Sequence, residues 1–190
     1  MLLVISGPSG VGKTTITHAI EKQVQGAVFS VSATTRLRTL IEADGEDYLF
    51  VTNEQFDEMI QNGEFLEYAG VFGNRYGTPR SWVDRELAQG HLVILEIDVQ
   101  GAVSVKRQRP GALCLFILPP DDDSLIERLR GRGREDESVI QRRFGEARRE
   151  MEIARNGGVY DIFLVNRNLD DAVARVVALV KHERARRGLA

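Results

Sequence analysis

Eight consecutive residues near the start of the chain have the types and spacing of a phosphate-binding loop. Residues 7–14 read Gly-Pro-Ser-Gly-Val-Gly-Lys-Thr. The glycines allow backbone conformations that a Cβ atom would block, so the loop amides can close around a phosphate. In such a loop the lysine, here Lys13, reaches the β- and γ-phosphates, and the hydroxyl of Thr14 is placed to ligate Mg²⁺. The motif predicts a nucleoside-triphosphate site and leaves the phosphate acceptor open.

The residues on either side of the loop support this interpretation. Leu2–Ser6 is a short apolar strand, and a helix begins at about Thr15. The amides and the dipole of this helix would point at a bound anion. A glycine-rich turn that merely joins a strand to a helix is the alternative, and it is weaker because every fixed position of the motif is present.

Apolar runs alternate with helical patterns along the chain, which predicts a parallel sheet of the P-loop NTPase type flanked by helices. The runs are Leu2–Ser6, Leu92–Ile97, Leu113–Leu118 and Ile162–Val165. The patterns also predict a short helix over Gln100–Arg107 and a long amphipathic helix over Leu169–Arg187.

Two stretches depart from this alternation and are interpreted as insertions. Residues 30–80 contain β-like segments at Phe29–Ser32, Tyr48–Val51 and Phe65–Ala69, and one helix over Asn53–Asn62 with Asn53 as its cap. Residues 119–150 contain a pair of helices rich in arginine. We expect both to be parts of a single α/β unit, because no long linker or repeat is visible.

Charge is unevenly distributed along the 190 residues, although the net charge is only −3. Residues 1–100 contain 7 Lys and Arg against 14 Asp and Glu, whereas residues 101–190 contain 18 against 14. Eight arginines fall between Arg128 and Arg149. A basic half could indicate nucleic acid. Beside a phosphate-binding loop, arginine forks more plausibly serve nucleotide phosphates, so we expect no nucleic-acid partner.

Cysteine, histidine and hydropathy patterns exclude several classes of protein. Cys114 is the only cysteine and lies in an apolar run, which predicts a buried thiol without a disulfide. The three histidines are far apart in sequence and have no metal-ligand spacing. No apolar stretch approaches the roughly 20 residues that span a membrane, and no leader segment is evident. We expect a cytoplasmic protein, monomeric or homodimeric, without a membrane partner.

Residues that could bind a phosphorylated acceptor are concentrated in the first insertion. Arg36 and the hydroxyls of Tyr48 and Tyr76 could form a phosphate clamp. Guanine presents N1–H and a 2-amino group as donors, so Glu67 with a nearby hydroxyl such as Thr78 or Ser32 would suit it. Each residue alone is weak evidence, because a single tyrosine is more often core and a single glutamate more often solvated.

Over essentially its whole length the chain resembles guanylate kinases. The resemblance rests on ordered blocks at residues 7–15, 30–36, 45–51, 62–69, 73–78, 95–101, 116–120, 128–133 and 165–166. It implies transfer of the γ-phosphate of ATP to GMP, and to dGMP, with Mg²⁺ in purine nucleotide metabolism. It also implies a core (residues 1–30, 81–118 and 151–190), a GMP-binding lobe (31–80) and a lid (119–150).

The resemblance assigns roles position by position. For ATP it implies Gly7, Pro8, Ser9, Gly10, Val11, Gly12, Lys13, Thr14, Thr15 and, at the adenine, Asn166. For GMP it implies Ser32, Arg36, Glu42, Tyr48, Glu67, Tyr76, Thr78, Glu96 and Asp98. Lys13, Arg132 and Arg143 would be the catalytic cations. Thr14 would ligate Mg²⁺, and Asp98 would contact it through water.

The chain departs from the family pattern directly after Arg36. A second clamp arginine is absent at its usual place, where Thr39 stands, and Ile41 replaces the glycine before Glu42. Arg38 lies one residue earlier, and on an extended segment that shift turns a side chain to the other face. We therefore expect weaker GMP affinity with activity retained.

Two other functions stay open at this point. One is a kinase for another phosphorylated acceptor such as a sugar phosphate, because the clamp segment is altered. The other is a non-catalytic guanylate-kinase-like binding module, which the intact phosphate-binding loop and the lid arginines disfavour.

Overall fold

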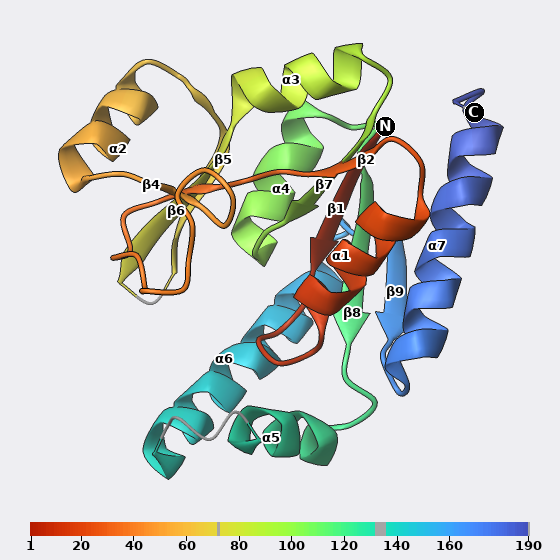
Figure 1. Ribbon diagram of the computed structural model, residues 1–190. Coiled ribbons are helices and arrows are strands. Elements are labelled where there is room, and N and C mark those ends of the chain that lie inside the picture. Colours follow the sequence, from red (N-terminus) through yellow and green to blue (C-terminus); the bar gives the residue numbers. More distant parts are fainter. Residues whose placement is uncertain (72, 132–135, 190) are drawn as a thin grey trace.

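A parallel central sheet and a smaller mixed sheet organise the chain in the computed structural model, which describes residues 1–71, 73–131 and 136–189 (Figure 1). The helices are α1 (Lys13–Gln23), α2 (Asn53–Gln61), α3 (Arg80–Ala88), α4 (Val99–Gln108), α5 (Asp122–Arg130), α6 (Glu137–Asn156) and α7 (Leu169–Arg186). The strands are β1 (Leu2–Ser6), β2 (Ala27–Phe29), β3 (Ala33–Thr34), β4 (Leu49–Phe50), β5 (Phe65–Val71), β6 (Asn74–Pro79), β7 (Leu92–Glu96), β8 (Leu113–Leu118) and β9 (Ile162–Val165).

The central sheet has the strand order β2-β7-β1-β8-β9, and all of its pairings are parallel. Helices cover both of its faces, which explains why β1, β7 and β8 are apolar almost throughout. Alternate residues of each strand enter two separate cores. Val4, Leu95 and Phe116 pack in one, together with residues of α4 and α6. Ile5 and Ile94 pack in the other, with residues of α1 and α7. The predicted α/β class is confirmed.

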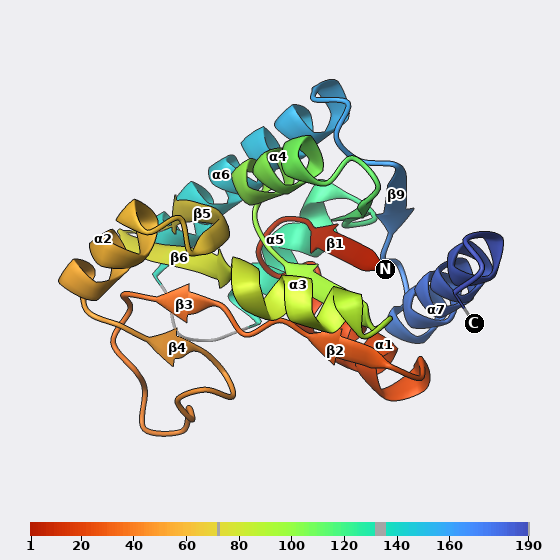
Figure 2. The same ribbon diagram turned by 90° about the horizontal axis from the view of Figure 1, so that it is seen from above.

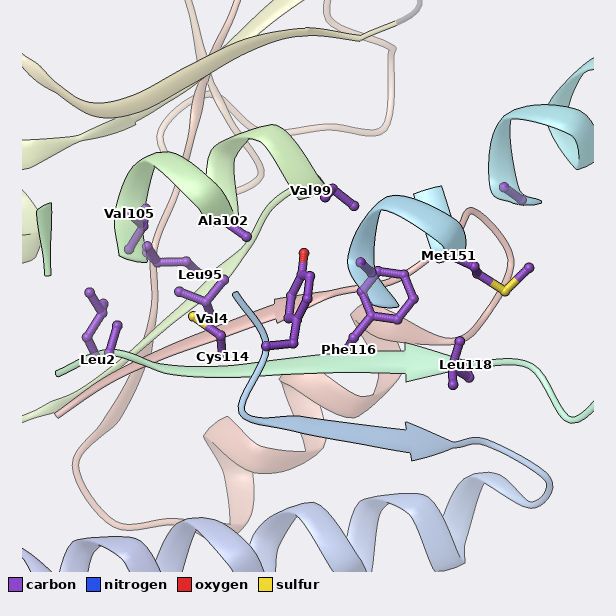
Figure 3. Packing of buried hydrophobic residues seen from close by; sticks show 14 of the residues in the cluster. Leu2, Val4, Leu95, Val99, Ala102, Val105, Cys114, Phe116, Leu118 and Met151 are labelled. Atoms are coloured by element: carbon purple, nitrogen blue, oxygen red, sulfur yellow. The ribbon is translucent and has the colours of Figure 1, made fainter. Parts of the chain in front are cut away.

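The first of these cores fixes helices α4 and α6 on the sheet. Figure 3 shows Cys114 and Phe116 of β8 pointing toward Ala102 of α4 and Met151 of α6. Cys114 is fully buried, as predicted, and burial raises the pKa of its thiol to about 11. The tight packing around Phe116 and Met151 holds α6 in place, and α6 carries residues of the candidate site described below.

The small sheet stands beside the central one and has the order β4-β3-β6-β5 (Figure 2). One of its faces packs on α2, where the rings of Phe56 and Phe65 lie 4.6 Å apart and bury Ala33 between the sheet and the helix. The opposite face packs in part on α4 through Leu66 and in part borders a cavity. The small sheet therefore carries polar side chains on a support with its own apolar core.

Several boundaries differ from the sequence-based expectations. Phe29 ends β2 in the central sheet, and the small sheet begins at Ala33 instead. Helix α2 is capped by Thr52, not Asn53. The Thr52 side chain accepts from the amide of Gln55, and the Gln55 side chain accepts from the amide of Thr52. This reciprocal pair satisfies two amide donors, whereas Asn53 is already inside the helix.

Two elements were not anticipated at all, namely strand β6 and helix α3. Strand β6 contains Gly77 and Pro79, which disfavour strand by propensity, but pairing on both sides with β3 and β5 overrides that preference. No helix in the described part of the chain is both long and apolar enough to cross a membrane.

Candidate active site

The phosphate-binding loop joins β1 to α1 at the carboxyl end of the central sheet (Figure 1). Gly12 has φ 96° and precedes the first turn of α1, a conformation that strains any residue with a Cβ. A Cβ at Gly7 would lie 2.5 Å from the carbonyl oxygen of Ile117. The Nζ atom of Lys13 donates to the carbonyl oxygens of Gly7 at 2.7 Å and Pro8 at 3.2 Å. The predicted lysine is therefore folded over its own loop.

Two carboxylates at the end of β7, those of Glu96 and Asp98, lie at the same edge as the phosphate-binding loop. Ile5 of β1 pairs with Glu96 of β7, so the residues after both strands emerge side by side. Thr14 donates to Oε1 of Glu96 at 3.0 Å, and Thr17 donates to Oε2 at 3.3 Å. Asp98 caps α4 by accepting from the amide of Gly101 at 2.7 Å, and burial raises the pKa of its carboxyl group.

Hydroxyl and carboxylate oxygens are the ligands that Mg²⁺ prefers, and it keeps several waters when bound. Thr14 and Asp98 supply such oxygens at this edge, so the residues present fit the predicted ion. Among the described residues no group of three or more His, Cys, Asp and Glu side chains is arranged to hold a metal by itself.

The small sheet contributes a buried carboxylate on the opposite side. Glu67 of β5 pairs with Thr78 of β6, and the Thr78 hydroxyl donates to Oε1 of Glu67 at 2.5 Å. Glu67 is only 5% exposed, and burial raises the pKa of its carboxyl group to about 7. A Cβ at Gly101 would lie 2.5 Å from Oε2 of Glu67, so the carboxylate reaches its place only because position 101 is glycine.

A cavity of about 260 Å³ lies between the phosphate-binding loop, the small sheet and α6. Ten of the predicted site residues line it: Gly7, Ser9, Lys13, Ser32, Tyr48, Glu67, Tyr76, Glu96, Asp98 and Arg143. Ala69, Val71, Ile97, Glu146, Ala147 and Glu150 line it as well, and none of them was predicted. The tertiary structure thus unites the triphosphate loop and the candidate acceptor residues around one space.

Arg36 lies next to this cavity and is already paired. Its guanidinium group donates to Oε1 of Glu42 at 2.5 Å and to Oε2 at 3.1 Å. Its Cζ atom is 5.3 Å from the ring centre of Tyr48, and the rings of Tyr48 and Tyr76 are 5.8 Å apart. The three predicted clamp residues, Arg36, Tyr48 and Tyr76, are therefore together, and Glu42 lies beside them. Arg38 is exposed and has no hydrogen bond or ion pair with any other described residue.

Helix α6 supplies the remaining wall. Arg143 donates to the hydroxyl of Ser9, which joins this helix to the phosphate-binding loop. Glu146 and Glu150 follow on the same face at helical spacing, and this periodicity relative to Arg143 is the signal that could have revealed them. Burial raises the pKa of Glu150 to about 7. The predicted Arg132 lies outside the described residues.

Asn166 directly follows β9 and is buried against the loop. Its Nδ2 atom donates to the carbonyl oxygen of Val11 at 2.8 Å, and a Cβ at Gly12 would lie 2.9 Å from that Nδ2. Its Oδ1 atom is buried without a hydrogen-bond partner among the described residues. Asn166 therefore holds the phosphate-binding loop, and its contact with adenine stays a prediction.

Comparison with known proteins decides the family. The model of the guanylate kinase family matches residues 1–183. The chain belongs to the guanylate kinase family. A guanylate kinase of Anaeromyxobacter dehalogenans is 47% identical over 187 residues, which cover 98% of this chain and 82% of that protein. A guanylate kinase of Thermotoga maritima is 44% identical, with 97% of this chain and 88% of that protein covered.

A solved structure supports the same membership. The crystal structure of guanylate kinase from Anaplasma phagocytophilum matches with a TM-score of 0.78 at 32% identity, covering 96% of this chain and 85% of that chain. The resemblance stated from the sequence blocks is confirmed, and with it the prediction of an enzyme of the guanylate kinase type. The roles of the individual site residues in this guanylate kinase family member stay predictions.

Proposed function

We propose that the protein transfers the γ-phosphate of ATP to GMP, giving ADP and GDP, and that it also accepts dGMP. One observation carries the proposal: Lys13 of the phosphate-binding loop and Glu67 of the small sheet line the same cavity. A triphosphate held by the loop would thus face an acceptor whose base is bound at Glu67. Membership in the guanylate kinase family supports this choice of donor and acceptor.

Guanine recognition would rest on Glu67 and the hydroxyls around it. An ionised Glu67 accepts from N1–H and from the 2-amino group, which adenine does not offer in that arrangement. Thr78 holds one carboxylate oxygen, and Ser32 also lines the cavity. Asp98 lies beside Glu67 and supplies a further acceptor. A site built for these donors would reject acceptors that lack them, because its buried polar groups would be left unpaired.

At the other end of the acceptor, Arg36, Tyr48 and Tyr76 would bind the phosphate, and Glu42 would orient Arg36. An oxygen of that phosphate attacks the γ-phosphorus of ATP in line. The bond between the γ-phosphorus and the β–γ bridging oxygen then breaks, and ADP leaves. The acceptor phosphate is already anionic near neutral pH, so this step requires no general base.

Charge on the migrating group would be neutralised by Lys13, Arg132 and Arg143. Thr14 and, through water, Asp98 would hold Mg²⁺, which when bound offsets negative charge on the β- and γ-phosphates. Glu96 would orient Thr14 through their hydrogen bond. Alignment and positive charge are the main contributions that phosphoryl transfer needs from a protein.

The division of the chain into lobes is part of the same proposal. Residues 1–30, 81–118 and 151–190 form the core, 31–80 the GMP-binding lobe and 119–150 the lid, which excludes water when both nucleotides are bound. Helix α6 runs across the boundary at residue 150, so it links lid to core mechanically. The enzyme would work in the cytoplasm, in purine nucleotide metabolism, as a monomer or homodimer.

A coupled assay of ADP release tests the proposed function. We expect turnover with Mg·ATP and GMP or dGMP, little with AMP, CMP, UMP or sugar phosphates, and loss of turnover in excess EDTA. Turnover with a sugar phosphate in place of GMP would contradict the proposal and favour the altered-acceptor alternative. Absence of turnover with every acceptor, from folded protein that still binds ATP, would favour a non-catalytic binding module.

A further inference from the structure

The segment between Arg36 and Glu42 is organised around a single carboxylate oxygen. Oε2 of Glu42 accepts from the amide of Thr39 at 2.9 Å, from the hydroxyl of Thr39 at 2.9 Å and from Nη1 of Arg36 at 3.1 Å. Oε1 accepts from Nη2 of Arg36 at 2.5 Å. The amide of Glu42 in turn donates to the carbonyl oxygen of Thr39 at 3.3 Å. Thr39 therefore binds the same carboxylate oxygen of Glu42 that Nη1 of Arg36 binds.

The apolar side chains next to Thr39 in residues 37–41 are exposed and do not pack against the rest of the protein. Leu37, Leu40 and Ile41 are 89%, 105% and 92% exposed. Segments without buried apolar contacts stay ordered only through their polar contacts. Within residues 37–41, those polar contacts are the bonds of Thr39 to Glu42 and the bond from Arg36 to the Leu37 carbonyl oxygen. The orientation of the Glu42 carboxylate thus depends on Thr39.

An ion pair of partly exposed groups is weak unless its geometry is fixed in advance. The side chains of Arg36 and Glu42 are 27% and 19% exposed, and the guanidinium group also lies over the rings of Tyr48 and Phe50. Hydrogen bonds from Arg36 and then from Thr39 hold the pKa of the Glu42 carboxyl group at about 2. The Arg36–Glu42 pair is consequently charged across the neutral range, and the hydrogen bonds of Thr39 restrict the orientation of the Glu42 carboxylate.

We propose that Thr39 is a positioning residue of the acceptor-phosphate clamp: it fixes Glu42, and Glu42 fixes the Arg36 guanidinium group beside Tyr48 and Tyr76. This inference rests on the proposed function for its assignment of Arg36 to the GMP phosphate. It also gives position 39 a role despite the absent arginine. A contact made equally in the ground state and the transition state changes KM and leaves kcat unaltered.

Three variants test the inference in steady-state kinetics. Thr39→Val keeps the shape and the backbone amide but removes the hydroxyl, Thr39→Ser restores it, and Leu40→Ala is a matched exposed control in the same segment. We expect Thr39→Val to raise KM for GMP about three- to tenfold with kcat within about twofold, whereas KM for ATP is unchanged. Thr39→Ser and Leu40→Ala should behave like the unsubstituted protein. Because Glu42 stays charged, the ratio of the KM for GMP of Thr39→Val to that of the unsubstituted protein should be the same from pH 6 to 9.

A second measurement does not depend on the identity of the acceptor. In nitrogen-15 spectra of the full chain, the side-chain Nε–H signal of Arg36 reports how firmly its guanidinium group is held. We expect this signal to broaden or shift in Thr39→Val and to recover in Thr39→Ser. An unchanged signal together with an unchanged KM for GMP would overturn the inference while leaving the proposed function intact. If the unsubstituted protein does not phosphorylate GMP, the proposed function fails and the Arg36 signal alone decides the role of Thr39.

Discussion

The hydroxyl of Thr78 donates to Oε1 of Glu67 at 2.5 Å across a strand pair, and it does so inside the wall of the candidate active site. One carboxylate oxygen is thereby fixed, and Oε2 lies against the backbone at Gly101. A carboxyl group that is 5% exposed is costly to ionise, and the pKa of Glu67 is raised accordingly. A buried carboxylate in the lining of the cavity is consistent with the proposal that Glu67 accepts hydrogen bonds from a ligand.

Glu67→Gln should weaken GMP binding and stabilise the fold. The neutral amide cannot provide two charged acceptors, so we expect kcat/KM for GMP to fall roughly ten- to a hundredfold. The loss of a buried charge should raise the free energy of unfolding at pH 8 by roughly 2–3 kcal/mol. Kinetics with GMP and urea unfolding at pH 8 check the two effects. A variant that loses both stability and affinity would argue against the assignment of Glu67.

The raised pKa of Glu67 predicts that the stability of the folded protein decreases as the pH rises. The pKa of Glu67 in the folded protein, about 7, lies above its ordinary value of 4.5. Its contribution to stability is therefore complete below about pH 4.5 and is lost as the pH rises through about 7. Glu150, whose pKa is also raised to about 7 by burial, acts in the same direction. Relative to the double variant with glutamine at both positions, the protein should lose stability between pH 5 and 8. Urea unfolding at several pH values measures this difference.

GMP affinity should follow the opposite course, because guanine needs the ionised form of Glu67. We expect KM for GMP to rise as the pH falls from 8 to 6, with a midpoint near 7, and KM for ATP to change little. In Glu67→Gln the rise should vanish. An identical pH profile in that variant would assign the ionisation to another group.

Gly101 should be essential for the position of Glu67. A Cβ there would lie 2.5 Å from Oε2 of Glu67 and 3.2 Å from Oδ1 of Asp98. Gly101→Ala should raise KM for GMP about tenfold or more, because both carboxylates must move. Gly145→Ala is a matched control in helix α6, where nothing lies within 4 Å of the new Cβ. That change should leave KM unaltered and add roughly 0.5–1 kcal/mol of stability, since alanine favours helix. Equal kinetics for the two variants would refute this account of Gly101.

Lys13→Ala should strongly reduce turnover without unfolding the protein. The Nζ atom donates to two carbonyl oxygens of its own loop, so we expect its loss to disturb the loop locally and to leave the two hydrophobic cores intact. Removal of one charged donor from a migrating phosphoryl group should lower kcat at least a hundredfold. Thermal unfolding measured beside the kinetics separates this effect from misfolding. Turnover of Lys13→Ala at the rate of the unsubstituted protein would contradict the proposed mechanism.

Asn166→Ala should loosen the phosphate-binding loop. The Val11 carbonyl oxygen would lose its buried partner, which should cost about 1–3 kcal/mol of loop stability. We therefore expect KM to rise about tenfold for ATP and by a similar factor for inosine triphosphate, which lacks the 6-amino group. A loss confined to ATP would mean that Asn166 acts only at the adenine. Competition by inorganic tripolyphosphate gives an independent measure of the loop.

The sequence predicted the elements whose signals are local. Residues 7–14 specify the phosphate-binding loop because glycine positions and the lysine act within a few bonds of one another. Leu2–Ser6 and Leu113–Leu118 were found at the bounds that the structure has, because strands buried on both faces are apolar throughout. Strand β6 was missed because its glycine and proline are tolerated only through pairing with β3 and β5.

Which side chains face one another was decided by the tertiary structure. The sequence named Lys13, Glu67 and Arg143 as separate candidates, and packing of α6 and the small sheet around the loop united them in one cavity. It did not reveal Glu150, because a glutamate on an amphipathic helix is ordinarily solvated until a second layer covers it. Nor did it show that Thr39 binds Glu42, since that contact depends on the path of an exposed loop. Motifs whose residues act on near neighbours can be identified from the sequence. The burial of side chains, the register of strands and the distances between site residues arise only when distant segments pack.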